Sequence, residues 1–204
     1  RMRKGDPADD FTSELLAAYD TDPDDLSLKE IDTAVYGLSF AGHEIVTSFL
    51  SNSLICLLSD RLQWEKICED PSKIENAVEE VLRHSSPQTG LRRVVNEDTE
   101  IAGIKVPAGT HVFLSLVSAN NDGEEFDHPR TFEIERENAS QHISFGRGIH
   151  FCLGTRLANL ETNISLQTLA GEAPSLDLVA DQKFAYFPNI TLRGPEDLWL
   201  TWTG

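Results

Sequence analysis

The segment that most constrains the fold of this chain covers residues 144–154 and reads Ser-Phe-Gly-Arg-Gly-Ile-His-Phe-Cys-Leu-Gly. It places Cys152 among glycines, which let the backbone turn tightly and approach a flat or bulky ligand. Residues 155–169, directly after it, have the apolar spacing of a helix. A cysteine just before a helix lies near free N–H groups and the positive end of the helix dipole, which favours the thiolate.

Two interpretations of this cysteine compete. A lone cysteine in a glycine-rich turn is most often a buried structural residue. A glycine-flanked thiolate on a loop is also one of the ways in which proteins hold haem iron. Here the whole pattern Phe-Gly-x-Gly-x-His-x-Cys-Leu-Gly is present, and it resembles the haem-binding loop of the cytochrome P450 family, the haem-thiolate monooxygenases.

The resemblance implies haem b as the cofactor, with the thiolate of Cys152 as the axial ligand of the iron. Further loop residues against the haem are Phe145, Gly146 and Gly154. The sequence therefore predicts a haem site built around one metal ligand.

Haem carries two propionates, and by resemblance Arg93 and His150 bind them. A lone arginine near a strand is otherwise a surface group. Arg92 is adjacent to Arg93, and because side chains alternate along a strand, only one of the two is expected to face the haem.

Glu80 and Arg83 stand three residues apart in a predicted helix. Such a pair is by default a solvated surface contact. In the family that the loop resembles, a Glu-x-x-Arg pair is buried and joined by an arginine from a Pro-x-x-Phe-x-x-x-Arg segment, which here ends at Arg136. The resemblance therefore assigns Glu80, Arg83 and Arg136 to a structural triad rather than to chemistry.

The segment Ala41-Gly42-His43-Glu44 resembles the oxygen-binding segment of the family, in which two small residues let a helix pass close over the haem. The alternative for a mid-helix Ala-Gly pair is simple helix packing. By resemblance Glu44 delivers protons, with Ala41 and Gly42 beside it. The family usually has Thr next, but this chain has Ile45, which cannot form a hydrogen bond; Ser48, one turn on, is a displaced substitute.

By resemblance, substrate contacts come from three segments: the face of the long helix, the turn at residues 87–91 and the late loop at residues 184–189. A hydrophobic hairpin packed on itself is an equal alternative for the late loop. The residues assigned to substrate are Leu38, Ile45, Gln88, Thr89, Leu91 and Tyr186.

Length and composition describe an ordinary globular protein: 204 residues, 40% hydrophobic and 25% charged. The formal net charge of −17 disfavours nucleic acid as a partner. Unbroken apolar runs fall short of the roughly 20 residues that span a bilayer, so no membrane is expected. Three cysteines without disulfide spacing indicate a reducing compartment, the cytoplasm.

Apolar periodicity and turn signals predict helices over residues 9–19, 27–59, 60–69, 73–83 and 155–169. Ser27 and Glu30 have the spacing of a capping box. In residues 60–69, the side chains expected to face inward are those of Leu62, Ile67 and Cys68. Short strands with a hairpin are predicted over residues 91–117, a loop over 119–141, and strands and turns over 174–204. No repeat or linker is visible, so one compact unit is expected.

The family motifs run in order through residues 9–202, but they all belong to the C-terminal half of a protein about twice this length. The resemblance therefore implies a mainly α fold with small β-sheets, in which the long central helix crosses over the haem. Residues 1–204 would form the C-terminal haem-binding portion of a single domain, completed by the N-terminal half of the same protein.

His150, rather than Arg, resembles soluble bacterial members of the family, which implies electrons from a ferredoxin and its reductase. The expected activity is insertion of one oxygen atom into a small organic substrate of secondary metabolism. Two alternatives stay open: a peroxide-dependent or oxidative-coupling enzyme, which Ile45 favours, and a non-catalytic haem-binding fragment.

Overall fold

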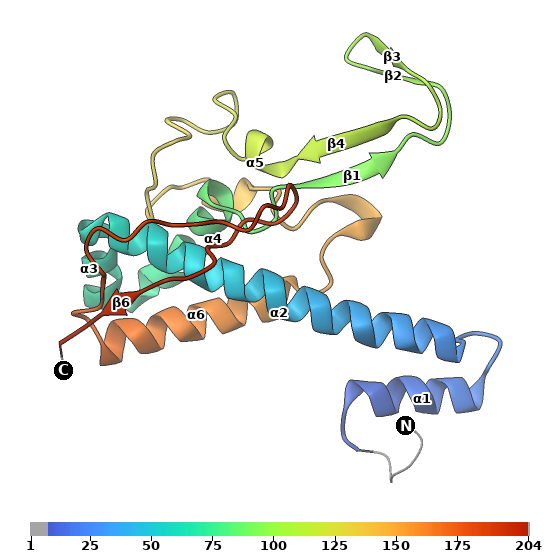
Figure 1. Cartoon of the computed structure of the whole chain (residues 1–204), viewed down its shortest axis with the longest axis horizontal. Helices are drawn as coiled ribbons and strands as arrows, with labels where there is room; N and C mark the ends of the chain where they lie inside the picture. Colours follow the sequence, from blue (N-terminus) through green and yellow to red (C-terminus); the bar gives the residue numbers. More distant parts are fainter. Residues whose placement is uncertain (1–7, 204) are drawn as a thin grey trace. The chain divides into compact units, whose positions relative to one another are not determined.

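The computed structural model describes residues 8–203 and is mainly helical (Figure 1). Its α-helices are α1 Phe11–Thr21, α2 Leu28–Ser59, α3 Arg61–Glu69, α4 Ile74–His84, α5 Leu116–Ala119 and α6 Thr155–Glu172. Short 3₁₀ turns are η1 Pro71–Lys73, η2 Ala139–Gln141 and η3 Gly148–His150. The strands are β1 Gly90–Val94, β2 Thr99–Ile101, β3 Ile104–Val106, β4 His111–Ser115, β5 Asp177–Leu178 and β6 Leu200–Thr201.

The starts of α1, α2 and α3 follow from capping side chains. Asp10 accepts the amide of Ser13 at 2.8 Å, and Asp60 accepts the amide of Leu62 at 3.2 Å. The capping box before α2 is present: the amide of Ser27 donates to Glu30, and the amide of Glu30 donates to the Ser27 hydroxyl. The predicted helices are therefore confirmed, with ends shifted by up to three residues.

The described residues divide into two units, the first ending at Glu44 and the second beginning at Ile45. This differs from the single compact unit expected from the sequence, and the boundary lies inside α2. The apolar side chains of Tyr36, Leu38 and Phe40 are exposed, whereas the core of the second unit begins on α2 with Phe49.

Helix α2 is long and apolar enough to cross a membrane by length and composition alone, with 33% of its most apolar window buried. The core helix of a soluble protein meets the same criterion. No membrane-spanning helix was predicted from the sequence, because its unbroken apolar runs are short. Helix α2 meets the criterion of length and composition because the polar residues that interrupt those runs are mostly uncharged.

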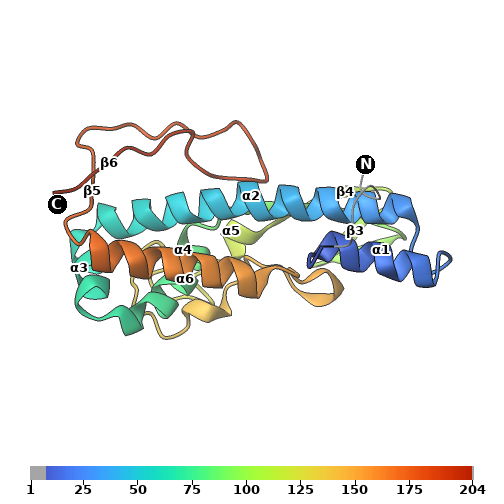
Figure 2. The same cartoon turned by 90° about the horizontal axis from the view of Figure 1, so that it is seen from below.

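The core of the second unit forms where the end of α2 meets α3, α4 and α6 (Figures 1 and 2). Trp64 and Ile67 are fully buried on α3. The prediction that Leu62 faces inward is wrong, since it is 67% exposed. Helix α3 instead turns Trp64 to the core, where its indole N–H donates to the carbonyl of Pro174 at 3.0 Å.

The sheets are small and antiparallel: β1 pairs with β4, β2 with β3 and β5 with β6. The β1–β4 pair forms a ribbon that carries the β2–β3 hairpin at its far end (Figure 1). Ala102 and Gly103 close that hairpin with φ values of 49° and 80°. The predicted hairpin over residues 91–117 is therefore confirmed.

The late segment, residues 174–203, is tied to the body of the second unit at several points. Gln88 forms an antiparallel bridge with Leu192. The Asn52 amide group, on α2, donates to the carbonyls of Ser85 and Arg193 at 3.1 and 3.0 Å. Gly194 lies directly against Ser48 of α2, with no room for a side chain. A polar anchor and a close backbone approach thus hold a segment that has little secondary structure.

Candidate functional site

The loop at residues 144–154 folds back so that Cys152 meets its beginning. The amide of Cys152 donates to the carbonyl of Phe145 at 3.0 Å. Gly146 and Gly148 make this return possible with φ values of 73° and 77°, a region that side chains disfavour. Gly154 is the N-cap of α6 without a side-chain capping bond, so the cysteine stands beside the uncapped start of a helix.

The loop presents a half-buried cysteine among exposed apolar side chains. Ile149 and Leu153 are 97% and 87% exposed, and Phe151 is exposed as well. A Cβ placed on Gly148 would meet open space. Among residues 8–203, no group of three His, Cys, Asp or Glu side chains is gathered to hold a metal ion. One thiol on an open apolar loop fits a large flat ligand that brings its own metal, as haem does.

Helix α4 and the buried Asn120 anchor the beginning of the loop through hydrogen bonds. The Asn120 amide nitrogen donates to the Ser144 hydroxyl at 2.8 Å, and its oxygen accepts the amide of Ile143 at 2.8 Å. The Ser144 hydroxyl donates in turn to the carbonyl of Leu82 at 2.6 Å. Asn120 is 1% exposed, so these bonds are made away from water, where leaving a partner unpaired is costly.

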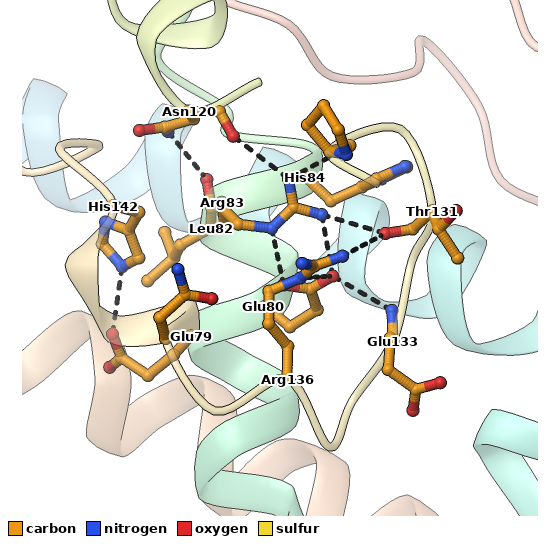
Figure 3. A network of polar contacts seen from close by, with 12 residues as sticks. Glu79, Glu80, Leu82, Arg83, His84, Asn120, Thr131, Glu133, Arg136 and His142 are labelled. Atoms are coloured by element: carbon orange, nitrogen blue, oxygen red, sulfur yellow. Dashed lines mark hydrogen bonds and ion pairs between the residues drawn. The ribbon is translucent and has the colours of Figure 1, made fainter. Parts of the chain in front are cut away.

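Glu80, Arg83 and Arg136 meet in one buried ion cluster (Figure 3). Arg83 donates to both carboxylate oxygens of Glu80, at 2.7 and 2.8 Å, and the side chains of both are fully buried. Arg136 reaches the same carboxylate at 3.1 Å. The scaffolding role assigned to the three residues stays a prediction.

The same arginines also fix the irregular chain that leads to the cysteine loop. Arg83 donates to the carbonyls of Asn120, Pro129 and Thr131 at 3.0, 2.7 and 3.0 Å. Arg136 donates to further carbonyls of that stretch, at Asp127, His128 and Thr131. Guanidinium groups thus satisfy backbone oxygens that no helix or sheet satisfies.

The other cysteines are structural. Burial raises the pKa of the Cys56 thiol to about 12, so it stays protonated at neutral pH. Its sulfur lies 3.9 Å from Nδ1 of His84, whose pKa is lowered mainly by burial. Burial also raises the pKa of Cys68. Neither thiol has the character of a nucleophile or a metal ligand.

The turn at residues 87–91 is hydrogen-bonded to residues that directly follow the late loop at residues 184–189. The Gln88 amide nitrogen donates to the carbonyl of Thr191 at 2.9 Å, and the Thr89 hydroxyl donates to the carbonyl of Ile190. The ring of Tyr186 is half-buried, with the guanidinium of Arg193 3.9 Å from its centroid. The turn therefore lies beside the end of the late loop, and Leu91 is half-buried at the start of β1.

The candidate propionate ligands are exposed. Arg93 lies on β1 opposite Val112, and its guanidinium donates to the carbonyl of Arg92 at 3.0 Å. Arg92 is exposed as well, so burial does not decide which of the two would face the haem. His150 ends the 3₁₀ turn η3 and is also exposed.

The candidate oxygen-binding residues lie on an uninterrupted stretch of α2. Leu38, Ala41 and Gly42 are exposed and Glu44 is half-buried; all four belong to the first unit. Ile45, the first residue of the second unit, is half-buried.

Several residues of the loop's support were missed in the sequence: Glu79, Asn120, His142 and Asn159. No short motif marks them, since their partners are far apart in the chain. The bond between Asn159 and Glu79 joins residues 80 positions apart. The one available signal was the position of His142, just before the glycine-rich loop.

Comparison with known proteins identifies the fold. The cytochrome P450 family model matches residues 2–170. The biotin biosynthesis cytochrome P450 of Bacillus subtilis is 40% identical over 201 residues, which cover 98% of this chain and 50% of that protein. The 6-deoxyerythronolide B hydroxylase of Saccharopolyspora erythraea is 35% identical over 197 residues, with 96% and 48% covered. The chain spans about half the length of the curated relatives it matches.

Solved structures agree. The cytochrome P450 named CREJ, in complex with (4-ethylphenyl) dihydrogen phosphate, superposes with a TM-score of 0.93 at 40% identity, over 96% of this chain and 48% of that one. An intact type IV self-sufficient cytochrome P450 monooxygenase gives a TM-score of 0.90 at 40% identity, over 94% of this chain and 25% of that one.

These matches place the chain in a class of mainly helical proteins with small sheets that bind haem b. The chain belongs to the cytochrome P450 family.

Proposed function

We propose that the protein to which this chain belongs is a haem-thiolate monooxygenase, with Cys152 as the axial ligand of the haem iron. The observation that carries the proposal is the loop itself: one thiol, framed by left-handed glycines and exposed apolar side chains, before an uncapped helix. We further propose that Phe145, Gly146 and Gly154 shape the haem-binding surface, and that Arg93 and His150 bind the propionates.

When bound, haem b supplies the oxidising chemistry with dioxygen. The chain's own residues hold it and manage protons. Cys152 would hold the haem iron as a thiolate, and its electron donation would support the oxidising chemistry. Glu44 takes up and releases the proton that the reaction consumes, with the small residues Ala41 and Gly42 beside it. Glu80, Arg83 and Arg136 hold the chain segment that precedes the loop.

The substrate is proposed to be a small organic molecule of secondary metabolism. Relatives include the 6-deoxyerythronolide B hydroxylase and a vitamin D(3) 25-hydroxylase of Pseudonocardia autotrophica. The proposed contacts are Leu38, Ile45, Gln88, Thr89, Leu91 and Tyr186. Electrons would come from a ferredoxin and its reductase in the cytoplasm, and Arg147 and Arg156 are exposed cationic groups on either side of Cys152 that suit an acidic donor.

Ile45 favours a second candidate. Its side chain cannot donate or accept a hydrogen bond, so Glu44 lacks the neighbouring hydroxyl that the family usually provides. The Ser48 side chain packs on Gly194 and is a poor replacement. An enzyme that uses peroxide, or that couples substrates oxidatively, depends less on proton delivery through Glu44 and a neighbouring hydroxyl. Turnover with peroxide in the absence of a reductase would support it.

A third candidate is a haem-binding fragment without catalysis, in which residues 1–204 are the C-terminal portion of one domain and require the N-terminal half for activity. It predicts haem binding without turnover by either oxidant. Activity of the haem-loaded chain with dioxygen or with peroxide would exclude it.

The decisive experiment is the reduced, carbon monoxide difference spectrum of the haem-loaded chain and of a longer parent protein. We expect the strongly red-shifted Soret band of a thiolate-bound iron, and its loss in Cys152→Ala. Haem binding without that band in the parent, or an unchanged spectrum in Cys152→Ala, would refute the assignment. A band from the parent alone would make this chain one half of the site.

A further inference from the structure

His142 lies just before the cysteine loop and is joined to helix α4. Its side chain is 4% exposed, and its Nε2 lies 3.0 Å from a carboxylate oxygen of Glu79. Its Nδ1 accepts the backbone amide of Ser144 at 3.1 Å. Because a backbone N–H can only donate, Nδ1 carries the lone pair, so Nε2 carries the hydrogen that bonds Glu79. These two bonds fix the tautomer and the orientation of the ring.

Glu79 connects three parts of the fold. One carboxylate oxygen accepts from His142, and the other accepts from the amide nitrogen of Asn159 on α6 at 2.8 Å. Figure 3 shows the side chains of Glu79 and His142 pointing toward each other. In the described part of the chain, Oδ1 of Asn159 is buried without a hydrogen-bond partner. An ionised carboxylate only accepts, so Asn159 must turn its nitrogen to Glu79 and leave its oxygen unpaired.

A short path of contacts leads from this cluster to the cysteine. The ring of His142 lies 5.8 Å from the ring of Phe145, centroid to centroid. The carbonyl of Phe145 accepts the amide of Cys152 at 3.0 Å. The imidazole is therefore linked to the cysteine backbone through a single intervening residue, Phe145.

We infer that His142 is a positioning residue for Cys152, with Glu79 as the group that holds its imidazole in place. The cluster takes no part in the reaction; it sets where Phe145, and through it the cysteine, lies relative to α4 and α6. In metal sites, groups that hydrogen-bond to a metal ligand likewise fix the orientation of that ligand. The ligand's identity as haem rests on the proposed function, whereas the position of Cys152 does not.

The test compares His142→Phe with His84→Phe. Phenylalanine keeps a ring against Phe145 but removes both hydrogen bonds of His142. His84 is a matched control: a half-buried histidine with a phenylalanine ring 5.6 Å away and Nε2 3.2 Å from the carbonyl of Arg130.

The first measurement needs no haem. The rate at which iodoacetamide alkylates Cys152 is followed by mass spectrometry of its peptide, so reaction at the other thiols does not interfere. We expect faster alkylation in His142→Phe, because the loop no longer holds the half-buried sulfur in place, and an unchanged rate in His84→Phe. Equal rates in His142→Phe and the unchanged chain, or equal acceleration in both variants, would overturn the inference.

The second measurement is haem affinity together with the thiolate band of the carbon monoxide spectrum. His142→Phe is expected to weaken haem binding roughly tenfold, the lower end of the effect of outer-shell partners. Failure of the proposed function is separable: if Cys152→Ala binds haem normally, the ligand assignment is wrong, and the haem-free alkylation result still decides the role of His142.

A conservative rescue distinguishes positioning from general damage, and it replaces the first comparison if His142→Phe does not fold. In Glu79→Gln the new amide oxygen can accept from His142, and its nitrogen can donate to the unpaired oxygen of Asn159 once that amide turns over. We expect Glu79→Gln to keep the normal alkylation rate and Glu79→Ala to raise it. Equal rates in these two variants would contradict the inference.

Discussion

At the scale of single residues, the chain pairs its charges where water cannot reach them. Arg83 has carboxylate or carbonyl partners on all of its nitrogens, and it shares the carboxylate of Glu80 with Arg136. Removing one member leaves an unpaired charge in a dry site, which costs far more than the pair contributes.

We therefore expect Arg83→Met to lower the free energy of unfolding by about 3–5 kcal/mol. The measurement is urea unfolding followed by circular dichroism. The control is Glu65→Ala, which breaks the exposed pair with Arg61 at 3.2 Å and should cost less than about 1 kcal/mol. If the two variants lose similar free energies of unfolding, the buried cluster contributes no more to stability than an exposed ion pair does.

A second prediction concerns pH. Burial lowers the pKa of His84 below its ordinary value, which is about 6.5 in an unfolded chain. Between the folded and the unfolded pKa of His84, the unfolded chain binds more protons than the folded chain. The free energy of unfolding is therefore highest above about pH 6.5 and falls as the pH drops from there toward the folded pKa. His84→Gln should flatten this decline, measured as urea midpoints at pH 7.5 and at lower pH. A variant that loses equal stability at every pH would contradict this.

At the scale of elements, the sequence predicted what local signals specify. Capping residues and apolar spacing located the helices, and β-branched runs with glycine turns located the ribbon. The features that the sequence did not predict depend on contacts between residues that are distant in the chain. Leu62 was expected inside because spacing alone does not show that Trp64 fills the inner face of α3. Within the site, the loop was found by its motif, whereas its support by Glu79, Asn120 and His142 was not.

The contact between α2 and the late segment was likewise not predicted, because Ser48 and Gly194 are far apart in the chain. A Cβ on Gly194 would overlap Ser48, so Gly194→Ala should destabilise the chain by about 1–3 kcal/mol. Ser48→Gly should recover part of that loss in the double variant, although glycine in a helix costs about 1 kcal/mol by itself. Thermal unfolding of the two single variants and the double variant checks this. Strict additivity of the two losses would show that the residues do not compete for space.

At the scale of the whole molecule, one face of α6 carries exposed apolar side chains. Leu157, Leu160 and Ile164 follow helical spacing on α6 and are 60%, 55% and 54% exposed, and Leu153, just before the helix, is 87% exposed. A continuous apolar surface of this kind marks an interface or a tendency to associate. The chain's net charge of −17 opposes association but does not cover the surface.

We expect the isolated chain to self-associate through this face. Leu157→Lys combined with Ile164→Lys should shift sedimentation velocity profiles toward the monomer. Gln167→Lys with Thr168→Lys adds the same charge to exposed polar positions of the same helix and serves as the control. If both pairs dissociate the chain equally, the added charge rather than the loss of apolar contact is responsible.

The anchors of Asn52 also bear on the order in which the chain can fold as it is synthesised. Its buried amide group needs the carbonyl of Ser85, 33 residues later, and that of Arg193, 141 residues later. Until the second partner has left the ribosome, α2 carries a polar group that cannot be buried without loss. The last step of core closure therefore waits until Arg193 has emerged, and a nascent chain that stalls earlier exposes the apolar end of α2 to chaperones and proteases.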